Sequence, residues 1–247
     1  VYYDGEYHVF HQWSPFTLNH GKKHWGHLVS TDLIHWKHLR YALTPTEGWG
    51  KGGCAAYSGS AVVDENNTAG FQTGDEQPIV AIWTAIGCGQ YIAYSNDRGR
   101  NFTWYEANPV IPQHKDDRDP MVRWHEPTRK WVMALPETRE EGRILAFYVS
   151  DDLKSWTRTG TVNGVGDCPD YYKLPVDGNP DNQKWILYGG HGNYRFGEFD
   201  VTTFIDEGGG HNLWRGNQYA TQTFDNTPDG RKIMMVWVVD NKMPPGM

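Results

Sequence analysis

The chain has 247 residues, a net charge of −7 and a mean hydropathy of −0.69. This length suffices for one large all-β domain, and the lack of any apolar run near about 18 residues excludes a membrane-spanning helix. The negative charge and the absence of basic clusters argue against the phosphate backbone of nucleic acid as a partner.

The first ten residues predict a β-hairpin. Residues 1–3 form an apolar strand, Asp4-Gly5 is a turn sequence, and residues 6–10 alternate as a second strand. No initiator methionine or signal peptide precedes this hairpin. Because natural domains rarely begin in mid-strand, we expect the sequence to be truncated at its N-terminus.

A short sequence recurs along the chain and predicts a repeated architecture. Residues 30–36 (STDLIHW) recur at 150–156 (SDDLKSW), and a looser copy runs from Ser95 to Trp104. The serines lie 65 and then 55 residues apart, and each copy separates an apolar strand from a tryptophan that begins another. We interpret each copy as the turn between the two outer strands of a blade, closed by side-chain hydrogen bonds.

Repeats of this length accommodate four strands of about five residues, which make one blade of a β-propeller. Blades are predicted near residues 1–43, 59–108, 119–162 and 167–204, and a fifth begins at 219–239. The prediction is an all-β, five-bladed propeller that occupies residues 1–247 as a single domain with an incomplete last blade. Frequent glycine and proline agree with strands joined by turns, and a β-sandwich is the alternative.

The cysteines and histidines give no sign of a metal site. Cys54, Cys88 and Cys168 are scattered and lack ligand spacing, so we expect neither a zinc site nor a disulfide framework, with at least one free thiol. Histidines at positions 8, 11, 24 and 27 crowd the first blade, but a spacing of three puts side chains on opposite faces of a strand. We interpret them as packing or loop residues, and no cofactor is predicted.

Two predicted blade starts carry carboxylates, at Arg118-Asp119-Pro120 and at Asp167-Cys168-Pro169-Asp170. Propellers place their ligand sites at one end of the central channel, where first strands begin. Glycoside hydrolysis needs two carboxyl groups, one that attacks or activates water and one that protonates the leaving oxygen. We expect the adjacent arginine to hold Asp119 ionised. The alternative for each motif is a turn that the aspartate merely caps.

Several motifs together resemble glycoside hydrolase family 32. In chain order they are residues 7–12 (YHVFHQ), 25–27 (WGH), 57–64 (YSGSAVVD), 118–120 (RDP) and 167–170 (DCPD). The resemblance implies a five-bladed propeller and retaining cleavage of β-fructofuranosides such as sucrose, inulin or levan. The propeller of this family is usually followed by a β-sandwich, which we expect to be absent from this sequence. Residues 66–71 are most similar to the exo-acting inulinase and levanase branch.

The resemblance also implies roles for individual residues. Asp119 matches the family's transition-state stabiliser, and Asp167 stands at the position of its acid/base. The implied substrate-binding residues are Gln12, Trp25, Tyr57, Ser58, Arg118 and Cys168. Tyr57 stands where the family usually has phenylalanine, so its hydroxyl either contacts a sugar or a carboxylate or is a structural replacement.

Two departures from the family concern catalysis. The family nucleophile is an aspartate in an Asn-Asp-Pro-Asn-Gly stretch, which we expect before Val1. The family acid/base is a glutamate, whereas position 167 is aspartate, which is one methylene shorter. Because a misplacement of about 1 Å can cost roughly 10²-fold in rate, Asp167 is a slow acid, an acid on a shifted backbone, or no acid at all.

The predicted function is a retaining hydrolase that releases fructose from fructan or sucrose-type carbohydrates without a metal. The alternatives are a transfructosylase on the same scaffold, a catalytically impaired fructan-binding propeller, and the neighbouring five-bladed arabinan and xylan hydrolases. Polymeric fructans do not cross membranes, so we expect a secreted or periplasmic protein. Asn66-Asn67-Thr68 and Asn101-Phe102-Thr103 are candidate glycosylation sequons.

Overall fold

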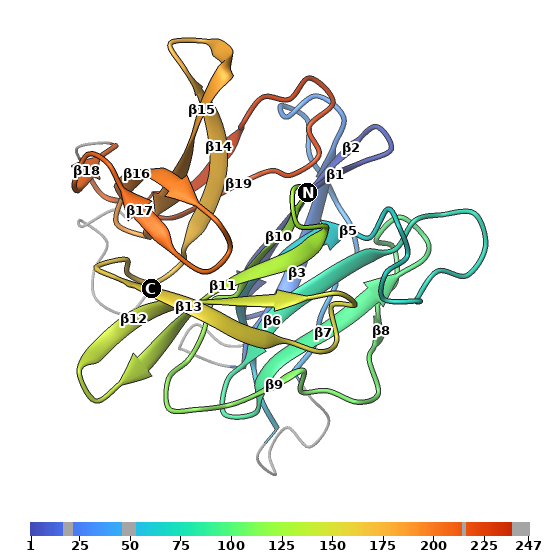
Figure 1. The fold of residues 1–247 in the computed structure, drawn as a ribbon. Coiled ribbons are helices and arrows are strands. Elements are labelled where there is room, and N and C mark those ends of the chain that lie inside the picture. Colours follow the sequence, from blue (N-terminus) through green and yellow to red (C-terminus); the bar gives the residue numbers. More distant parts are fainter. Residues whose placement is uncertain (17–21, 46–52, 214–215, 239–247) are drawn as a thin grey trace.

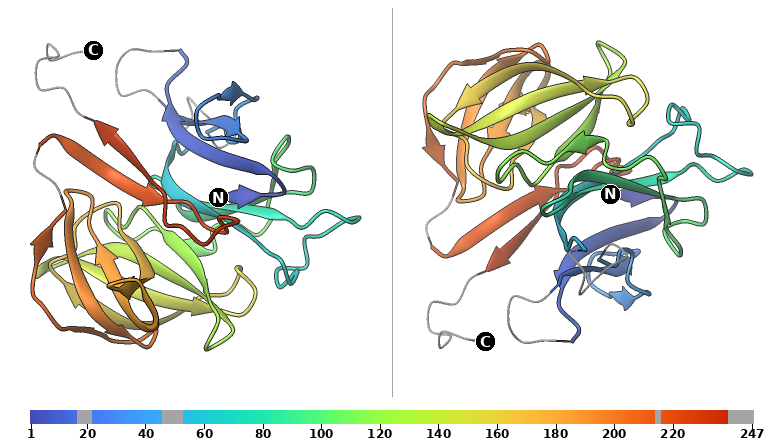
Figure 2. Two further views of the ribbon diagram at one scale, coloured as in Figure 1. Left: turned by 90° about the horizontal axis from the view of Figure 1, so that it is seen from above. Right: turned by 90° about the horizontal axis from the view of Figure 1, so that it is seen from below.

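The fold is an all-β propeller. The structure is a computed structural model that describes residues 1–16, 22–45, 53–213 and 216–238. Its strands form four sheets of four or five strands and one sheet of two, as Figure 1 shows. In Figure 2 the sheets follow one another in sequence order around a common centre, close to which the N-terminus lies. None of the described residues forms a helix long and apolar enough to cross a bilayer.

The first two sheets come from the N-terminal half of the chain. The first contains β1 (Tyr2–Tyr3), β2 (Glu6–Trp13), β3 (His24–Ser30) and β4 (Lys37–His38). The second contains β5 (Ala56–Val63), β6 (Ile79–Ala85), β7 (Gly89–Ser95), β8 (Thr103–Trp104) and β9 (Ile111–Pro112), the last paired with β7. The predicted N-terminal hairpin is confirmed, since β1 and β2 pair across Asp4 and Gly5, whose φ angles are 42° and 85°.

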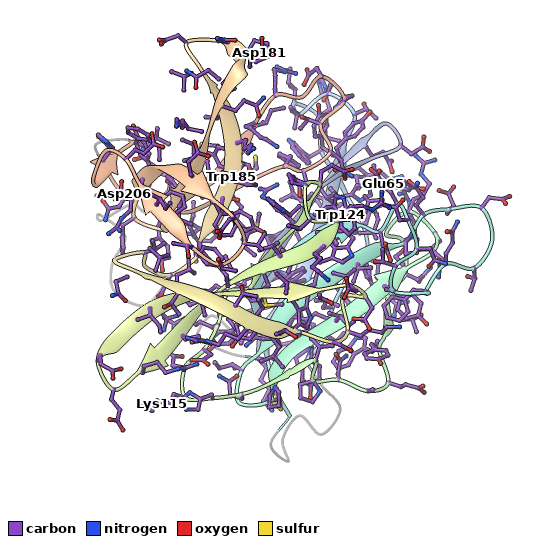
Figure 3. All side chains as sticks on the ribbon, in the orientation of Figure 1. Glu65, Lys115, Trp124, Asp181, Trp185 and Asp206 are labelled. Carbon is purple, nitrogen blue, oxygen red and sulfur yellow. A yellow bond between two sulfur atoms is a disulfide. The ribbon has the colours of Figure 1, made fainter. Side chains whose placement is uncertain are left out.

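The remaining sheets repeat this order. The third contains β10 (Met121–His125), β11 (Lys130–Arg139), β12 (Gly142–Ser150) and β13 (Thr157–Asn163). The fourth contains β14 (Asp170–Val176), β15 (Asn179–Tyr188), β16 (Asn193–Phe199), β17 (Phe204–Asp206) and β18 (His211–Asn212), the last paired with β16. The two-stranded sheet contains β19 (Gln218–Thr223) and β20 (Met234–Val238). Figure 3 shows Asp181 at the tip of the β14–β15 hairpin and Trp185 nearer the body of the molecule.

The repeated turn sequence joins the third and fourth strands of the first three sheets, as predicted. Ser30 Oγ accepts hydrogen bonds from the N–H groups of Asp32 and Leu33, and Asp32 Oδ1 accepts those of the next two residues. Residues 150–156 repeat the pattern. In the fourth sheet Asp200 caps the equivalent turn. The search for repeats within the sequence missed this copy, because position 200 is aspartate where the other copies have serine.

Apolar side chains form three buried clusters, each between neighbouring sheets. Trp25 of the first sheet lies 6.4 Å from Trp83 of the second, measured between ring centroids. Phe147 of the third sheet lies 6.4 Å from Tyr171 of the fourth. Full burial of a large apolar side chain contributes about 1.5–3 kcal/mol, so sheet-to-sheet packing stabilises the ring.

The histidines at positions 8, 11, 24 and 27 lie on β2 and β3. His8 Nδ1 and His27 Nε2 are 3.0 Å apart in a buried hydrogen bond. Burial lowers the pKa of each ring from the ordinary 6.5 to about 3, so both rings are neutral at neutral pH. His11 lies against Gly26, where a Cβ atom would come within 2.4 Å of the ring.

The prediction that the cysteines form no disulfide is wrong. Cys54 and Cys88 are bonded, which joins the segment before β5 to the β6–β7 turn. They are 34 residues apart, and the antiparallel pairing of β5 with β6 brings them together. The spacing of the cysteines in the sequence therefore does not predict this disulfide. Cys168 is a buried free thiol, which confirms the expected unpaired cysteine.

Loss of the disulfide is expected to lower the free energy of unfolding by about 4 kcal/mol, because the bond restricts the unfolded chain. Equilibrium denaturation of the Cys54→Ser/Cys88→Ser double variant, measured beside the parent, gives the value. As a control, dithiothreitol should destabilise the parent and leave the double variant unchanged. Equal stability of parent and variant would show that the bond contributes nothing.

Candidate active site

One cavity of about 840 Å³ brings together every site residue predicted from the sequence. These residues are Gln12, Trp25, Tyr57, Ser58, Arg118, Asp119, Asp167 and Cys168. They stand on β2, β3, β5 and the segments that precede β10 and β14. The cavity therefore lies where strand ends from different sheets meet, and the roles of these residues remain predictions.

Two hydrogen bonds join the first and second sheets in the cavity wall. Gln12 Nε2 donates to Ser58 Oγ at 2.6 Å, and Trp25 Nε1 donates to the carbonyl oxygen of Tyr57 at 2.7 Å. Gln12 and Trp25 are direct partners in the β2–β3 register. Their side chains are therefore held on one face of the first sheet, toward the second.

A β-bulge aims the Tyr57-Ser58 segment. The register between β5 and β6 shifts between Ala56 and Gly59. A Cβ atom on Gly59 would lie 2.0 Å from the carbonyl oxygen of Ile82, so this approach requires glycine. Bulges redirect side chains next to active sites, which accounts for the glycine within the Ser-Gly-Ser sequence.

Asp119 is fixed by contacts on every side. Its φ of 68° is disfavoured for residues other than glycine. Its N–H donates to Thr84 Oγ1 at 3.0 Å, and its Oδ2 accepts the N–H of Cys168 at 3.2 Å. The Cys168 Sγ and the Arg118 Nε lie 3.6 and 3.8 Å from the same oxygen. Unusual backbone conformations of this kind cluster at functional sites.

Burial raises the pKa of Asp119 above the ordinary 3.8. The sequence predicted that Arg118 holds this carboxyl ionised. The guanidinium does act in that direction, but desolvation outweighs it. Burial also raises the pKa of the Cys168 thiol, so the protonated thiol can donate a hydrogen bond to the carboxylate.

Both carboxylate oxygens of Asp167 are in ion pairs. Arg118 Nη2 lies 2.6 Å from Oδ2, and Arg143 Nε contacts Oδ1. Arg143 stands on β12, and the sequence analysis missed it because no local motif marks it. The turn before β14 is held by Gly190, whose N–H donates to the carbonyl oxygen of Asp167 at 2.7 Å.

A buried polar network joins β10, β14 and β19 at the cavity wall. Arg123 on β10 pairs with Asp170 on β14 at 2.8 Å, and Asp170 accepts the N–H and hydroxyl of Thr223 on β19 at 2.7 and 2.8 Å. Arg123 also pairs with Asp225, whose carbonyl oxygen accepts the N–H of Tyr2 at 2.9 Å. The sequence analysis quoted Asp170 within a motif but assigned it no role.

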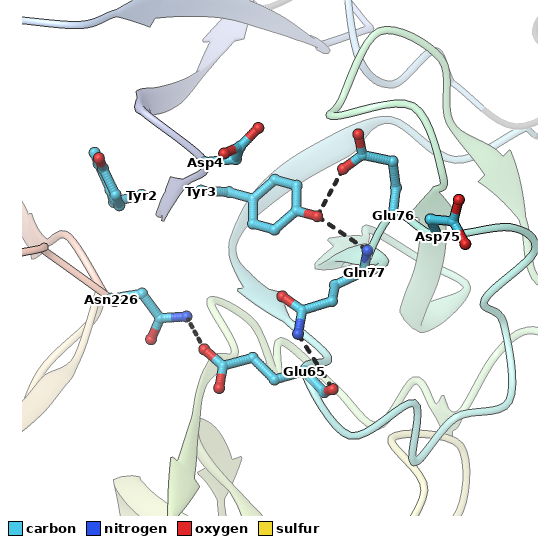
Figure 4. A pocket seen from close by; sticks show the side chains of 8 residues that line it. All are labelled: Tyr2, Tyr3, Asp4, Glu65, Asp75, Glu76, Gln77 and Asn226. Atoms are coloured by element: carbon cyan, nitrogen blue, oxygen red, sulfur yellow. Dashed lines mark hydrogen bonds between the residues drawn. The ribbon is translucent and has the colours of Figure 1, made fainter.

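A second cavity of about 520 Å³ lies at the other end of β5 and is shown in Figure 4. The Tyr3 hydroxyl donates to Glu76 at 2.7 Å and accepts the N–H of Gln77 at 3.0 Å. The amide of Asn226 donates to Glu65 at 3.1 Å. These polar groups satisfy one another between sheets. Within the described ranges, no group of three or more histidine, cysteine or acidic side chains is placed to hold a metal ion.

Residues 1–244 match the sequence profile of the glycosyl hydrolases family 32 N-terminal domain. The chain belongs to family 32. It is 45% identical to the levanase of Bacillus subtilis over 96% of this chain and 38% of that protein. It is 36% identical to an extracellular exo-inulinase of Aspergillus niger over 89% of this chain and 48% of that one.

The structural comparison agrees with the family 32 assignment. The crystal structure of exo-inulinase from Aspergillus awamori superposes with a TM-score of 0.78 at 32% identity, and covers 90% of this chain and 53% of that one. The resemblance seen in the sequence is therefore confirmed. The chain spans between 38% and 48% of the length of the two curated relatives.

Replacing Asp119 with asparagine is expected to raise the free energy of unfolding at neutral pH, because it removes a buried carboxylate. A pKa raised above 3.8 in the folded state means that the folded protein binds the proton more tightly than the unfolded chain. The stabilisation of the folded state by the protonated Asp119 carboxyl is present at low pH, and it is lost as pH rises through the folded-state pKa.

Denaturation of parent and Asp119→Asn across a pH series measures this effect. The gain from asparagine should grow with pH and disappear below the ordinary carboxyl pKa of 3.8. A difference that is independent of pH would contradict the assignment of the effect to ionisation.

Proposed function

We propose that the protein containing this chain is a retaining glycoside hydrolase that releases fructose from β-fructofuranosides such as levan, inulin and sucrose. The observation that carries the proposal is the convergence of Asp119, Asp167 and the Gln12–Ser58 pair on one cavity of a family 32 propeller. The relatives are named levanase and exo-inulinase, and these names supply the substrate class.

Asp167 is the proposed acid/base. In the first step its carboxyl gives a proton to the leaving oxygen, and in the second its carboxylate takes a proton from the attacking water. Asp119 and Arg118 hold the ring hydroxyls as positive charge develops. The proposed substrate-binding residues that also line the cavity are Gln12, Trp25, Tyr57, Ser58 and Cys168. The scheme requires no metal.

We expect the nucleophile of the proposed reaction before Val1, as the family resemblance implies. The proposal therefore concerns the protein with an N-terminal continuation. There an aspartate attacks the anomeric carbon and forms a fructosyl ester while the leaving oxygen departs with the proton. Water then cleaves the ester and regenerates both carboxyl groups.

We further propose that β19 and β20 belong to a fifth blade, because they lie between the fourth and first sheets in Figure 2. Residues 1–247 then form a single catalytic domain. Disulfides persist in oxidising compartments, so the bond between Cys54 and Cys88 supports a secreted or periplasmic location. The name of the exo-inulinase relative describes that protein as extracellular.

A fructan-binding propeller without turnover is the second candidate. One observation favours it, namely that arginines engage both carboxylate oxygens of Asp167. A general acid has to present one oxygen to the leaving group. Binding of fructo-oligosaccharide without release of fructose by the full protein would identify this function.

The test of the hydrolase is fructose release from sucrose, inulin and levan by the full protein and by Asp167→Glu. The parent should be active, and the glutamate variant should be about 10²-fold slower, because the added methylene displaces the carboxyl by about 1 Å. Asp167→Asn, which cannot donate the proton, is the inactive control. If the parent releases no fructose and the Asp167→Glu variant does, the natural protein is a fructan-binding propeller instead.

Gly190→Ala is expected to lower kcat/KM for fructose release by about 10²-fold. A Cβ atom there would lie 2.8 Å from the carbonyl oxygen of Asp167 and 3.1 Å from the ring of Tyr219, so the acid/base turn has to move. A Cβ atom added to Gly166 would have no neighbouring atom within 4 Å, so Gly166→Ala is the matched control. Equal rates for the two variants would show that the position of this turn does not limit catalysis.

A further inference from the structure

Four charged side chains, including the proposed acid/base Asp167, form a closed ring of alternating sign. Asp116 Oδ2 pairs with Arg118 Nη1 and lies 3.3 Å from Arg143 Nη1. Asp167 Oδ2 lies 2.6 Å from Arg118 Nη2, and its Oδ1 contacts Arg143 Nε. Each arginine therefore bridges both aspartates, and each aspartate bridges both arginines.

The ring is only partly open to solvent. The side chains of Arg118, Arg143 and Asp167 are 26%, 23% and 22% exposed, and that of Asp116 is 51% exposed. Charges that are partly withdrawn from water are screened less by salt than fully exposed ones. A change of charge at either Asp116 or Arg143 will therefore be felt at Asp167.

The hairpin of β11 and β12 aims Arg143 at this position. Arg143 is the direct register partner of Thr138, and its Nη1 lies 3.2 Å from Thr138 Oγ1 and 3.3 Å from the carbonyl oxygen of Asp116. Arg118 and Asp167 line the cavity, whereas Arg143 stands behind them. Its placement thus comes from the scaffold of the third sheet.

The two oxygens of Asp167 differ in their bonding. Oδ2 accepts a hydrogen bond from Arg118. Oδ1 is buried and has no hydrogen-bond partner, because its ion pair with Arg143 Nε does not have hydrogen-bond geometry. Arg143 therefore acts on Oδ1 through its charge and not through a hydrogen bond.

We propose that Arg143 and Asp116 are positioning residues that set the pH range over which Asp167 transfers its proton. This inference rests on the proposed role of Asp167 as acid/base. As the glycosidic C–O bond breaks, the proton of the Asp167 carboxyl passes to the leaving oxygen, and negative charge remains on the carboxylate. Arg143 stabilises that charge, and Asp116 offsets the positive charge of both arginines.

The groups that face Asp167 come from several elements. They are Asp116, Arg118 and Asp119 before β10, Arg143 on β12, the adjacent Cys168 and Tyr219 on β19. Burial raises the pKa of both the Cys168 thiol and the Tyr219 hydroxyl, so both are neutral in the working range. Substitution of Arg143 or Asp116 therefore changes one charge at a time.

The pH dependence of kcat/KM for fructose release by the full protein tests the proposal. In Arg143→Met the fall of kcat/KM at high pH, called the alkaline limb, should move up by about one pH unit. Loss of the cation makes the proton of Asp167 harder to remove. In Asp116→Asn it should move down, because the arginines lose their shared counter-charge. Arg143→Lys keeps the charge and should stay near the parent. Limbs that do not move, or that move together, would overturn the proposal.

A second readout separates this inference from the proposed function. Carbon-13 NMR titration of the aspartate carboxyls, with Asp167→Asn identifying the resonance, follows Asp167 whether or not fructose is released. A silent parent would overturn the hydrolase proposal alone. A titration midpoint of Asp167 that is the same in the parent and in Asp116→Asn would overturn the positioning role. The Asp116 side chain is half exposed, so this variant keeps the test decisive if Arg143→Met fails to fold.

Discussion

The buried ion pair between Arg123 and Asp170 holds the strand ends together at the axis of the propeller. Asp170 is fully buried, and it also accepts two hydrogen bonds from Thr223. Removing one partner of such a pair typically costs about 3–5 kcal/mol, because a buried charge is left uncompensated. The first strands of the third and fourth sheets are thereby held at a fixed spacing. Asp119 and Asp167 stand just before these two strands, so the geometry of the cavity depends on this contact.

The two carboxyl groups of the cavity have opposite surroundings. Asp119 is buried, and desolvation dominates its ionisation. Asp167 lies between two guanidinium groups and keeps partial access to solvent. Carboxyl groups in such different surroundings can take different chemical roles in one site. The bulge at Gly59 and the left-handed backbone of Asp119 add a rigid frame around them.

Local features of the fold could be predicted from the sequence, and contacts between distant segments could not. The N-terminal hairpin and the serine–aspartate turns are closed by neighbours in sequence, so their residues carry the signal. The placement of Asp119 and Asp167 at the starts of blades could be predicted because each precedes a predicted first strand. The approach of Arg143 to Asp167 and the bond between Cys54 and Cys88 depend on pairing across hairpins. The net effect of burial on Asp119 likewise requires the packed structure.

The serine–aspartate turns also bear on the order of folding. Most strands pair with their neighbour in sequence, so each sheet can grow from short loops whose closure costs little entropy. The hydrogen bond from Tyr2 N–H to the carbonyl oxygen of Asp225, in contrast, joins opposite ends of the described chain. Contacts of such high sequence separation form slowly. The individual sheets are therefore expected to form early, and closure of the ring to be the last event of folding.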